Sequence, residues 1–206
     1  MDIHLDQKNI KLWVQEDEIR ISIDRLEEFM NRFAKNEANF LCQELIKKWN
    51  SFLEKCSYKN ISSVNVTLPQ NISNYLPNGT KDAGVYSIFG KHVTSAKPLC
   101  FYVGMSASSE KLGHSSSIKK RLLLHLNKDL DPKGQYGISG FKGCFYWLRQ
   151  CSEIFICWAK VEVNDRDDAL RNKLELLELC LGVKLQALYL LGSNLQKFSF
   201  FDNVLI

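Results

Sequence analysis

Two tyrosines, an arginine and a histidine are the side chains of this sequence whose types and spacing suit chemistry on a phosphate ester. Tyr86 ends a Gly-Val-Tyr tripeptide and Tyr102 begins a Tyr-Val-Gly tripeptide, each in a strand-like run. Arg121 and His125 stand at i and i+4 of a helix-like segment, so both can face one reacting group. Splitting a phosphodiester requires an activated water, neutralisation of charge on the phosphate oxygens and help for the leaving oxygen. These residue types can supply those functions if a carboxylate also holds a cation.

That carboxylate is available further along the chain. Glu178 lies in a leucine-rich, helix-like run, and Glu175 is its neighbour about one helical turn earlier. Mg²⁺ prefers oxygen ligands, keeps several waters and commonly binds proteins through one or two carboxylates plus a substrate phosphate. One glutamate therefore suffices, and the spacing alone leaves both glutamates open as the metal ligand.

In order and character, these segments resemble the opening of the GIY-YIG nuclease domain, with two tyrosine-bearing strands followed by a helix that carries arginine and histidine. The chain departs from the family in having longer segments between the two tyrosine motifs and between Ser106 and Ile118. Each piece alone also occurs in ordinary proteins, where Tyr86 and Tyr102 would be half-buried strand aromatics and the charged residues a solvated helix face. The succession of these motifs in the family's order favours the interpretation as a nuclease domain.

The resemblance also covers the later part of the family's pattern, a helix with one glutamate and then an asparagine. The run Leu177-Glu178-Leu179-Cys180-Leu181 is similar to the family's helix, which favours Glu178 over Glu175. Asn194 follows it and takes the place of the asparagine. The resemblance implies that Glu178 binds Mg²⁺ or Mn²⁺ beside the scissile phosphate and that Asn194 orients the site through its amide.

The same resemblance implies roles for the other four residues. Tyr86 is the general base for the attacking water or positions it, and Tyr102 donates a hydrogen bond to the phosphate or nucleophile. Arg121 neutralises the transition-state charge, and His125 holds Tyr86 or relays its proton. A free tyrosine titrates near ~10, so Tyr86 needs neighbouring positive charge, such as that of Arg121, to act as a base at neutral pH.

Basic residues near these segments are the expected contacts to nucleic acid. Lys119 and Lys120 begin the helix-like segment, and Lys133 and Lys142 lie in a glycine-rich insertion over residues 128–143. Contacts from basic side chains to phosphates supply much of the affinity of DNA-binding proteins. A solvated helix start and a plain surface loop are the alternative interpretations of these two groups. The formal net charge of +4 is compatible with a nucleic-acid partner.

Composition predicts a soluble globular protein with one domain, or a core with an appended subdomain. The chain has 206 residues, 45% hydrophobic and 24% charged. No apolar run approaches the ~18 residues that a membrane span needs, and the start lacks the features of a signal peptide. We therefore expect a cytoplasmic protein. The seven cysteines include no Cys-x-x-Cys pair and are expected to be buried small hydrophobes in a reducing compartment.

The elements that must position the site are predicted as an α/β (α+β) fold in two parts. Residues 1–80 form an extension with a hairpin at 10–22 and a helical region that reaches about residue 56, either as one helix or as two helices divided at 36–39. Residues 81–206 form a GIY-YIG-like core, a small mixed three-stranded sheet flanked by helices. The core is expected in the order strand, strand, helix, strand, helix, over about 83–89, 99–105, 116–127, 153–163 and 166–182.

The layout, with extra mass before the core and in internal loops, is similar to that of compact GIY-YIG type II restriction endonucleases. The resemblance therefore implies a sequence-specific enzyme that cuts double-stranded DNA as a homodimer. The alternative enzyme is a structure-specific or phage-encoded nuclease of repair or recombination. The alternative of another class is a catalytically inactive module that binds nucleic acid or a protein. The sequence has neither the Gly-x-Ser-x-Gly elbow of serine hydrolases nor a phosphate-binding P-loop.

Overall fold

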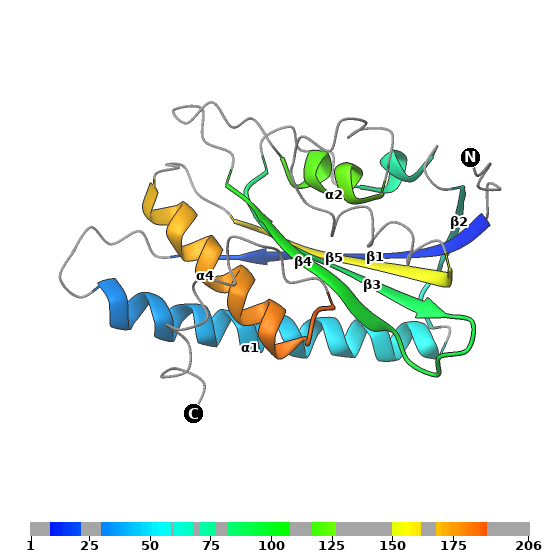
Figure 1. The fold of residues 1–206 in the computed structure, drawn as a ribbon, viewed down its shortest axis with the longest axis horizontal. Helices are drawn as coiled ribbons and strands as arrows, with labels where there is room; N and C mark the ends of the chain where they lie inside the picture. The colour runs from blue at the N-terminus through cyan, green and yellow to red at the C-terminus, as the bar shows by residue number, and fades with distance from the viewer. Residues whose placement is uncertain are drawn as a thin grey trace, which may run out of the picture.

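One mixed sheet of five strands organises the molecule, in the order β2-β1-β5-β3-β4 (Figure 1). The computed structural model describes residues 9–21, 30–58, 60–67, 71–76, 82–107, 117–126, 150–161 and 168–188. The strands are β1 (Asn9–Ile19), β2 (Val64–Thr67), β3 (Gly84–His92), β4 (Leu99–Ser106) and β5 (Cys151–Val161). β1 runs parallel to β5, whereas the pairs β1–β2, β3–β4 and β3–β5 are antiparallel.

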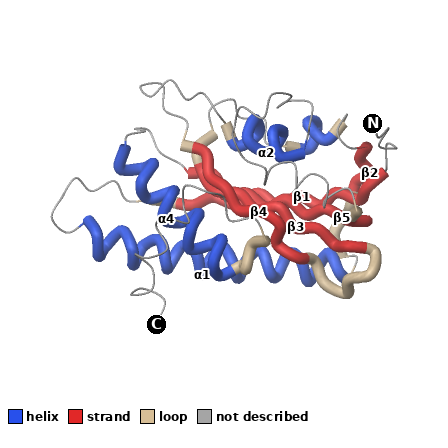
Figure 2. Tube along the Cα trace, in the orientation of Figure 1, coloured by secondary structure: helices blue, strands red, loops and turns tan. Residues whose placement is uncertain are grey.

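Helices cover both faces of this sheet. α1 (Met30–Ser57) and α4 (Asp168–Lys184) pack on one face, and α2 (Ile118–Leu126) packs on the other. Figure 2 shows these helices in blue on the two sides of the red strands. A short 3₁₀ turn, η1 (Ile72–Tyr75), contributes its buried first residue to the α2 side. The sheet therefore separates two hydrophobic cores, one under α1 and α4 and the other under α2.

β3 lies between β4 and β5 in the sheet and contributes side chains to both cores. Because successive side chains of a strand point to opposite faces, Val85 and Phe89 enter the core under α1 and α4, while Tyr86 and Ile88 enter the core under α2. The first seven residues of β3 are all buried. A strand covered on both faces reads as a continuous apolar run, so Tyr86 and Ser87 stand out as residues with a polar group in such a run.

The predicted mixed α/β class is confirmed, and the elements β3, β4, α2, β5 and α4 follow the predicted order. The sheet is larger than the predicted three strands, because β1 and β2 extend it beyond β5. The proposed division near residue 80 stays a prediction, although strands from both sides of that point share the sheet.

The predicted hairpin at 10–22 is wrong, because Asn9–Ile19 is one continuous strand. The polar stretch that suggests a turn is instead held by partners from distant elements. Lys160 of β5 forms an ion pair with Glu16, and the Trp49 indole Nε1 donates a 3.0 Å hydrogen bond to Asp17. These contacts satisfy the polar side chains within an extended strand.

Of the two alternatives for the helical region, the structure has the single helix, since α1 continues through residues 36–39. Two side chains of this stretch bind α4: Glu37 accepts a 3.1 Å hydrogen bond from Lys173, and Asn39 accepts one of 2.9 Å from Lys184. Tertiary contacts outweigh the modest helix propensity of asparagine here.

The described cysteines are free and buried, as the composition predicts: Cys42, Cys56, Cys100, Cys151, Cys157 and Cys180. Cys144 lies outside the described residues. None of the described helices combines the length and the apolar character that crossing a membrane requires.

Candidate active site

The hydroxyl of Tyr86 lies 2.9 Å from Nε2 of His125. Tyr86 comes from the central strand β3 and His125 from α2, which covers that face of the sheet. Each of the two residues is 1% exposed. Two of the predicted site residues, far apart in the sequence, thus share a buried hydrogen bond.

Tyr102 of β4 completes an aromatic cluster with this pair. Its ring centroid lies 4.0 Å from that of His125 and 6.0 Å from that of Tyr86. In the β3–β4 ladder, Tyr86 is opposite Gly104 and Ile88 is opposite Tyr102, which makes the two tyrosines diagonal neighbours on one face. Tyr86 and Tyr102 therefore meet on one face of the sheet.

Gly104 allows the Tyr86 ring to lie across β4. A Cβ atom at Gly104 would stand 2.5 Å from both Cζ and the hydroxyl oxygen of Tyr86, and 2.7 Å from Cε1 of Tyr102. Such distances are far inside van der Waals contact, so a side chain here would displace the cluster. Sequence reasoning included this glycine in the Tyr-Val-Gly motif but gave it no role. A glycine inside a strand is a recognised sign of close approach.

α2 is held in place at its first turn, which positions Arg121 and His125. Ser117 caps the helix, because its Oγ accepts a 3.2 Å hydrogen bond from the backbone N–H of Lys120. The backbone N–H of Ile118 donates a 3.3 Å hydrogen bond to the carbonyl of Asp82, just before β3. His125 lies on the buried face of α2, and Arg121, one turn earlier, is half-buried.

Burial and a neighbouring positive charge keep His125 neutral. Burial lowers its pKa from 6.5 to about 3, and the charge of Arg121 acts in the same direction. At neutral pH the imidazole therefore has one nitrogen available as an acceptor. With Nε2 facing the Tyr86 hydroxyl, His125 can accept a hydrogen bond or a proton from that tyrosine.

The pKa of Tyr86 is raised well above its ordinary value. Burial is the largest cause, followed by Tyr102; Arg121 lowers the pKa, and both Glu178 and a hydrogen bond with Tyr102 raise it. Arg121 therefore acts in the expected direction, but its effect is smaller than the cost of burying a phenolate. The neighbouring positive charge that Tyr86 needs in order to act as a base is therefore present in Arg121, but it does not offset burial.

Of the two candidate glutamates, Glu178 is the one that acts on the tyrosine. Its charge contributes to the raised pKa of Tyr86, which places the carboxylate within electrostatic reach of the cluster. Glu175 instead forms a 3.0 Å ion pair with Arg171 on its own helix. Both glutamates belong to α4, which packs on the face of the sheet opposite to α2, and the choice between them stays a prediction.

A divalent cation at this cluster stays a prediction. Within the described ranges, no group of three or more His, Cys, Asp and Glu side chains could enclose a metal ion. Mg²⁺ often uses only one or two carboxylates and takes its other ligands from water and phosphate. Glu178 can serve as that single carboxylate.

Some of the remaining predicted site residues lie within the described ranges, and others lie outside them. On α2, Lys119 is half-buried and Lys120 is exposed, next to Arg121. Lys133, Lys142 and Asn194 lie outside the described residues, so their predicted roles stay predictions.

No protein-family model, curated protein or solved structure matches the chain. The likeness to the GIY-YIG nucleases therefore rests on the residues and geometry described above.

Proposed function

We propose that this chain is a divalent-metal-dependent endonuclease that hydrolyses phosphodiester bonds in DNA with a site of the GIY-YIG type. The observation that carries the proposal is the buried 2.9 Å contact between Tyr86 and His125. Arg121 and Glu178 support it, because both charges act on the ionisation of the same tyrosine. A buried tyrosine, a neutral histidine, a guanidinium and a carboxylate can together supply the water activation and charge stabilisation that phosphodiester hydrolysis requires.

In the proposed reaction, a water oxygen attacks the phosphorus, and the bond from phosphorus to the 3′ oxygen breaks. The attacking water transfers a proton to the Tyr86 oxygen while the Tyr86 hydroxyl transfers its own proton to Nε2 of His125. The leaving 3′ oxygen takes a proton from solvent. Arg121 stabilises the negative charge that develops on the phosphate oxygens, and Tyr102 donates a hydrogen bond at the same site.

The raised pKa of Tyr86 determines how this transfer occurs. A phenol in this environment stays protonated at neutral pH, so Tyr86 does not act as a preformed phenolate. A concerted transfer through Tyr86 to neutral His125 avoids that buried charge. A divalent cation at Glu178 would supply Lewis-acid stabilisation of the leaving oxygen and would offset the carboxylate charge that raises the Tyr86 pKa.

The layout resemblance extends the proposal to a sequence-specific type II restriction enzyme that acts on double-stranded DNA as a homodimer. One observation favours a different function, an inactive module that binds nucleic acid. Tyr86 is only 1% exposed, so water and phosphate reach its hydroxyl only if neighbouring groups move. The two functions make opposite predictions for cleavage.

Plasmid DNA incubated with the purified protein and Mg²⁺ or Mn²⁺ distinguishes them. We expect cleavage that EDTA abolishes, and discrete fragments from a long DNA. Uniform degradation would support a nuclease without sequence specificity and would contradict a restriction enzyme. Absence of cleavage with both metals, under conditions where the protein binds DNA, would support the inactive module.

The two glutamates provide a matched test of the metal ligand. Glu178→Gln is expected to lose metal-dependent cleavage by about 10²-fold or more while DNA binding remains, because basic contacts dominate affinity. Glu175→Gln should cut almost normally, since Glu175 forms a partly exposed ion pair with Arg171 on its own helix. Cleavage measured across a Mg²⁺ titration decides the assignment. An active Glu178→Gln with an inactive Glu175→Gln would transfer the role to Glu175.

A further inference from the structure

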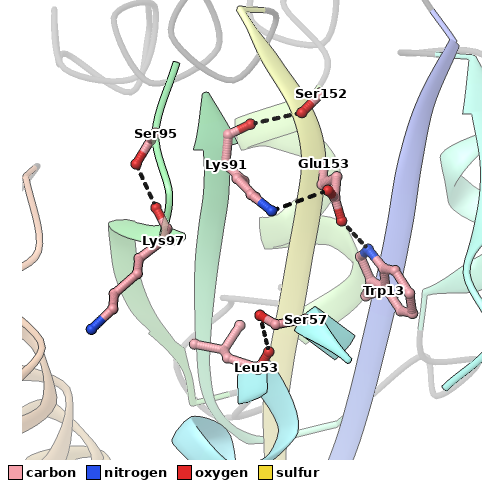
Figure 3. Close-up of polar contacts among 8 residues, drawn as sticks. All are labelled: Trp13, Leu53, Ser57, Lys91, Ser95, Lys97, Ser152 and Glu153. Carbon is pink, nitrogen blue, oxygen red and sulfur yellow. Dashed lines mark hydrogen bonds and ion pairs between the residues drawn. The ribbon is translucent and has the colours of Figure 1, made fainter. Parts of the chain in front are cut away.

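The three tryptophans that the structure describes differ in how their indole N–H groups are paired. Nε1 of Trp13 donates a 3.0 Å hydrogen bond to Glu153, as Figure 3 shows, and Nε1 of Trp49 donates one of 3.0 Å to Asp17. For Nε1 of Trp158, the described part of the chain places no acceptor within hydrogen-bond distance, although the atom is buried. Trp158 is therefore the exception among these tryptophans, because its buried donor is unpaired.

A buried N–H without an acceptor is unfavourable for the folded protein. The indole nitrogen is a donor only, so only an acceptor atom can satisfy it. Leaving such a group unpaired costs its full desolvation free energy, and native structures contain few groups of this kind. Trp158 as a whole is 3% exposed. Folding gains nothing from its N–H, and an acceptor that belongs to a ligand would explain why the group is kept.

Trp158 lies beside Tyr86 on the face of the sheet that α2 covers. The two residues are directly opposite each other in the antiparallel β3–β5 ladder, a relation that places Cβ atoms about 4.5–5.5 Å apart. Both side chains, with Tyr102, belong to the core under α2, whereas Trp13 and Trp49 belong to the core under α1 and α4. The unpaired indole is thus a neighbour of the candidate active site, and the two paired indoles are on the other side of the sheet.

The charges around this cluster indicate what kind of acceptor suits it. The positive charge of Arg121 acts on both Tyr86 and His125, and burial keeps His125 neutral. An anionic oxygen is therefore favoured over a neutral one, and hydrogen bonds to an ionised acceptor are about twice as strong as neutral ones. A phosphate oxygen of a nucleic acid is an acceptor of this kind.

We propose that the indole N–H of Trp158 donates a hydrogen bond to a phosphate oxygen of the DNA that binds beside Tyr86. The inference rests on the proposed function for the nature of the ligand, and it adds an uncharged binding residue on β5 to that site. Tyr86 and Trp158 are 1% and 3% exposed, so the movement that admits a phosphate to the tyrosine must also admit one to the indole. Binding then replaces an unpaired donor with a charge-assisted hydrogen bond.

The indole signal of Trp158 in a ¹⁵N spectrum of the full chain tests this contact directly. The chain has four tryptophans, and Trp158→Phe identifies the signal of this one. Duplex DNA is added in the presence of EDTA, so that binding is observed without cleavage. We expect the Trp158 signal to move downfield in a saturable way, while the signals of Trp13 and Trp49, whose N–H groups already have acceptors, stay in place. An unmoved Trp158 signal would overturn the proposal.

Two matched variants test what the contact contributes to binding. Trp158→Phe keeps an aromatic ring and removes the N–H, and it should raise the Kd for DNA about tenfold. The slope of log affinity against log salt should not change, because no charge is removed. Trp49→Phe makes the same change at a buried tryptophan of the other core and should leave the Kd unchanged. Wild-type affinity of Trp158→Phe, or equal loss in both variants, would contradict the contact.

The same measurements separate this contact from the proposed catalysis. DNA binding without cleavage, with a selective loss of affinity in Trp158→Phe, would support the contact and contradict the nuclease. Cleavage by the wild type together with wild-type affinity of Trp158→Phe would support the nuclease and overturn the contact. A phosphate contact carries no sequence information, so a loss of affinity confined to one DNA sequence would assign the N–H to a base and overturn the proposal.

Discussion

The two faces of the sheet differ in what they bury. Under α1 and α4, the core is mainly apolar, and its buried polar groups are isolated ones such as Ser87 and the Asp17 carboxylate, which is bonded to the Trp49 indole. Ion pairs such as Lys173–Glu37 lie at partly exposed positions. Under α2, the core contains a hydrogen-bonded polar cluster of Tyr86, Tyr102 and His125. Burying polar groups is unfavourable unless they are paired, and even then apolar residues of similar volume serve stability as well. The face under α1 and α4 thus provides a hydrophobic core, and the cluster under α2 is the part of the interior that stability alone does not explain.

The largest expected effect is the loss of cleavage when Arg121 is removed. Arg121→Ala should lower the rate by about 10²- to 10³-fold, because a charge on the transition state loses its partner. Its half-buried position predicts only a small change in the free energy of unfolding. Arg121→Lys keeps the positive charge but not the planar guanidinium, so its cleavage rate should lie between those of the wild type and of Arg121→Ala. Cleavage rates and urea unfolding, measured on the same preparations, check this, and a wild-type rate for Arg121→Ala would remove the residue from the site.

Substitutions in the core under α1 and α4 should affect stability and not cleavage. Leu45→Ala removes a side chain from α1 that is 1% exposed, and it should lower the free energy of unfolding by about 2–5 kcal/mol. The cleavage rate per folded molecule should stay close to that of the wild type. A folded Leu45→Ala protein with greatly reduced cleavage would contradict the division between the two faces.

A smaller effect on stability, joined to one on cleavage, is expected at Gly104. Gly104→Ala places a methyl group against the Tyr86 hydroxyl and should cost about 1–3 kcal/mol of stability and at least about tenfold in cleavage. Gly90→Ala is the matched control, since its Cβ would stand 2.6 Å from Cys151 and from Phe101. The Gly90→Ala variant should lower the stability of the folded protein to a similar extent and should retain cleavage. Equal loss of cleavage in both variants would show that strain in the sheet, and not the position of Tyr86, is responsible.

The last expected effect is a pH dependence of the free energy of unfolding that arises from His125. The unfolded chain takes up a proton at this residue near ~6.5, whereas the folded protein does so only near its lowered pKa of about 3. Between these values the unfolded state binds more protons, so this contribution to stability is present above ~6.5 and is lost as the pH falls, by about 2 kcal/mol between pH 7 and pH 5. Urea unfolding at several pH values measures the slope. His125→Asn should reduce that slope, and an unchanged slope would contradict the buried neutral state.

The sequence predicts those elements whose pattern is local. β5 is an apolar strand-like run, and the structure has it at Cys151–Val161, close to the predicted 153–163. α2 and α4 likewise begin and end within about two residues of the predicted limits. The continuity of β1 could not be predicted in this way. Its polar residues are stabilised by Lys160 and Trp49, which are distant in the sequence.

For the candidate site, the ionisation of the clustered residues could not be predicted from the sequence. The i, i+4 spacing correctly indicated that Arg121 and His125 share a side of one helix. The sign of the Tyr86 pKa shift depends on how deeply the tyrosine is buried and on how near Glu178 lies. Both follow from the packing of α2 and α4 on the sheet, and no local pattern of residues encodes that packing.

Cleavage by Tyr86→Phe tests the central claim most directly, because this change deletes only the hydroxyl that contacts His125. With protein in excess over DNA and Mg²⁺ present, we expect the rate to fall by about 10²-fold or more while the protein stays folded and binds DNA, with a free energy of unfolding lowered by about 1–3 kcal/mol because buried His125 loses its partner. Tyr58→Phe, at a tyrosine that is 77% exposed, is the control and should cut at the wild-type rate. A Tyr86→Phe protein that cuts as fast as the wild type would show that Tyr86 is a packing residue and that the buried cluster is not the catalytic site.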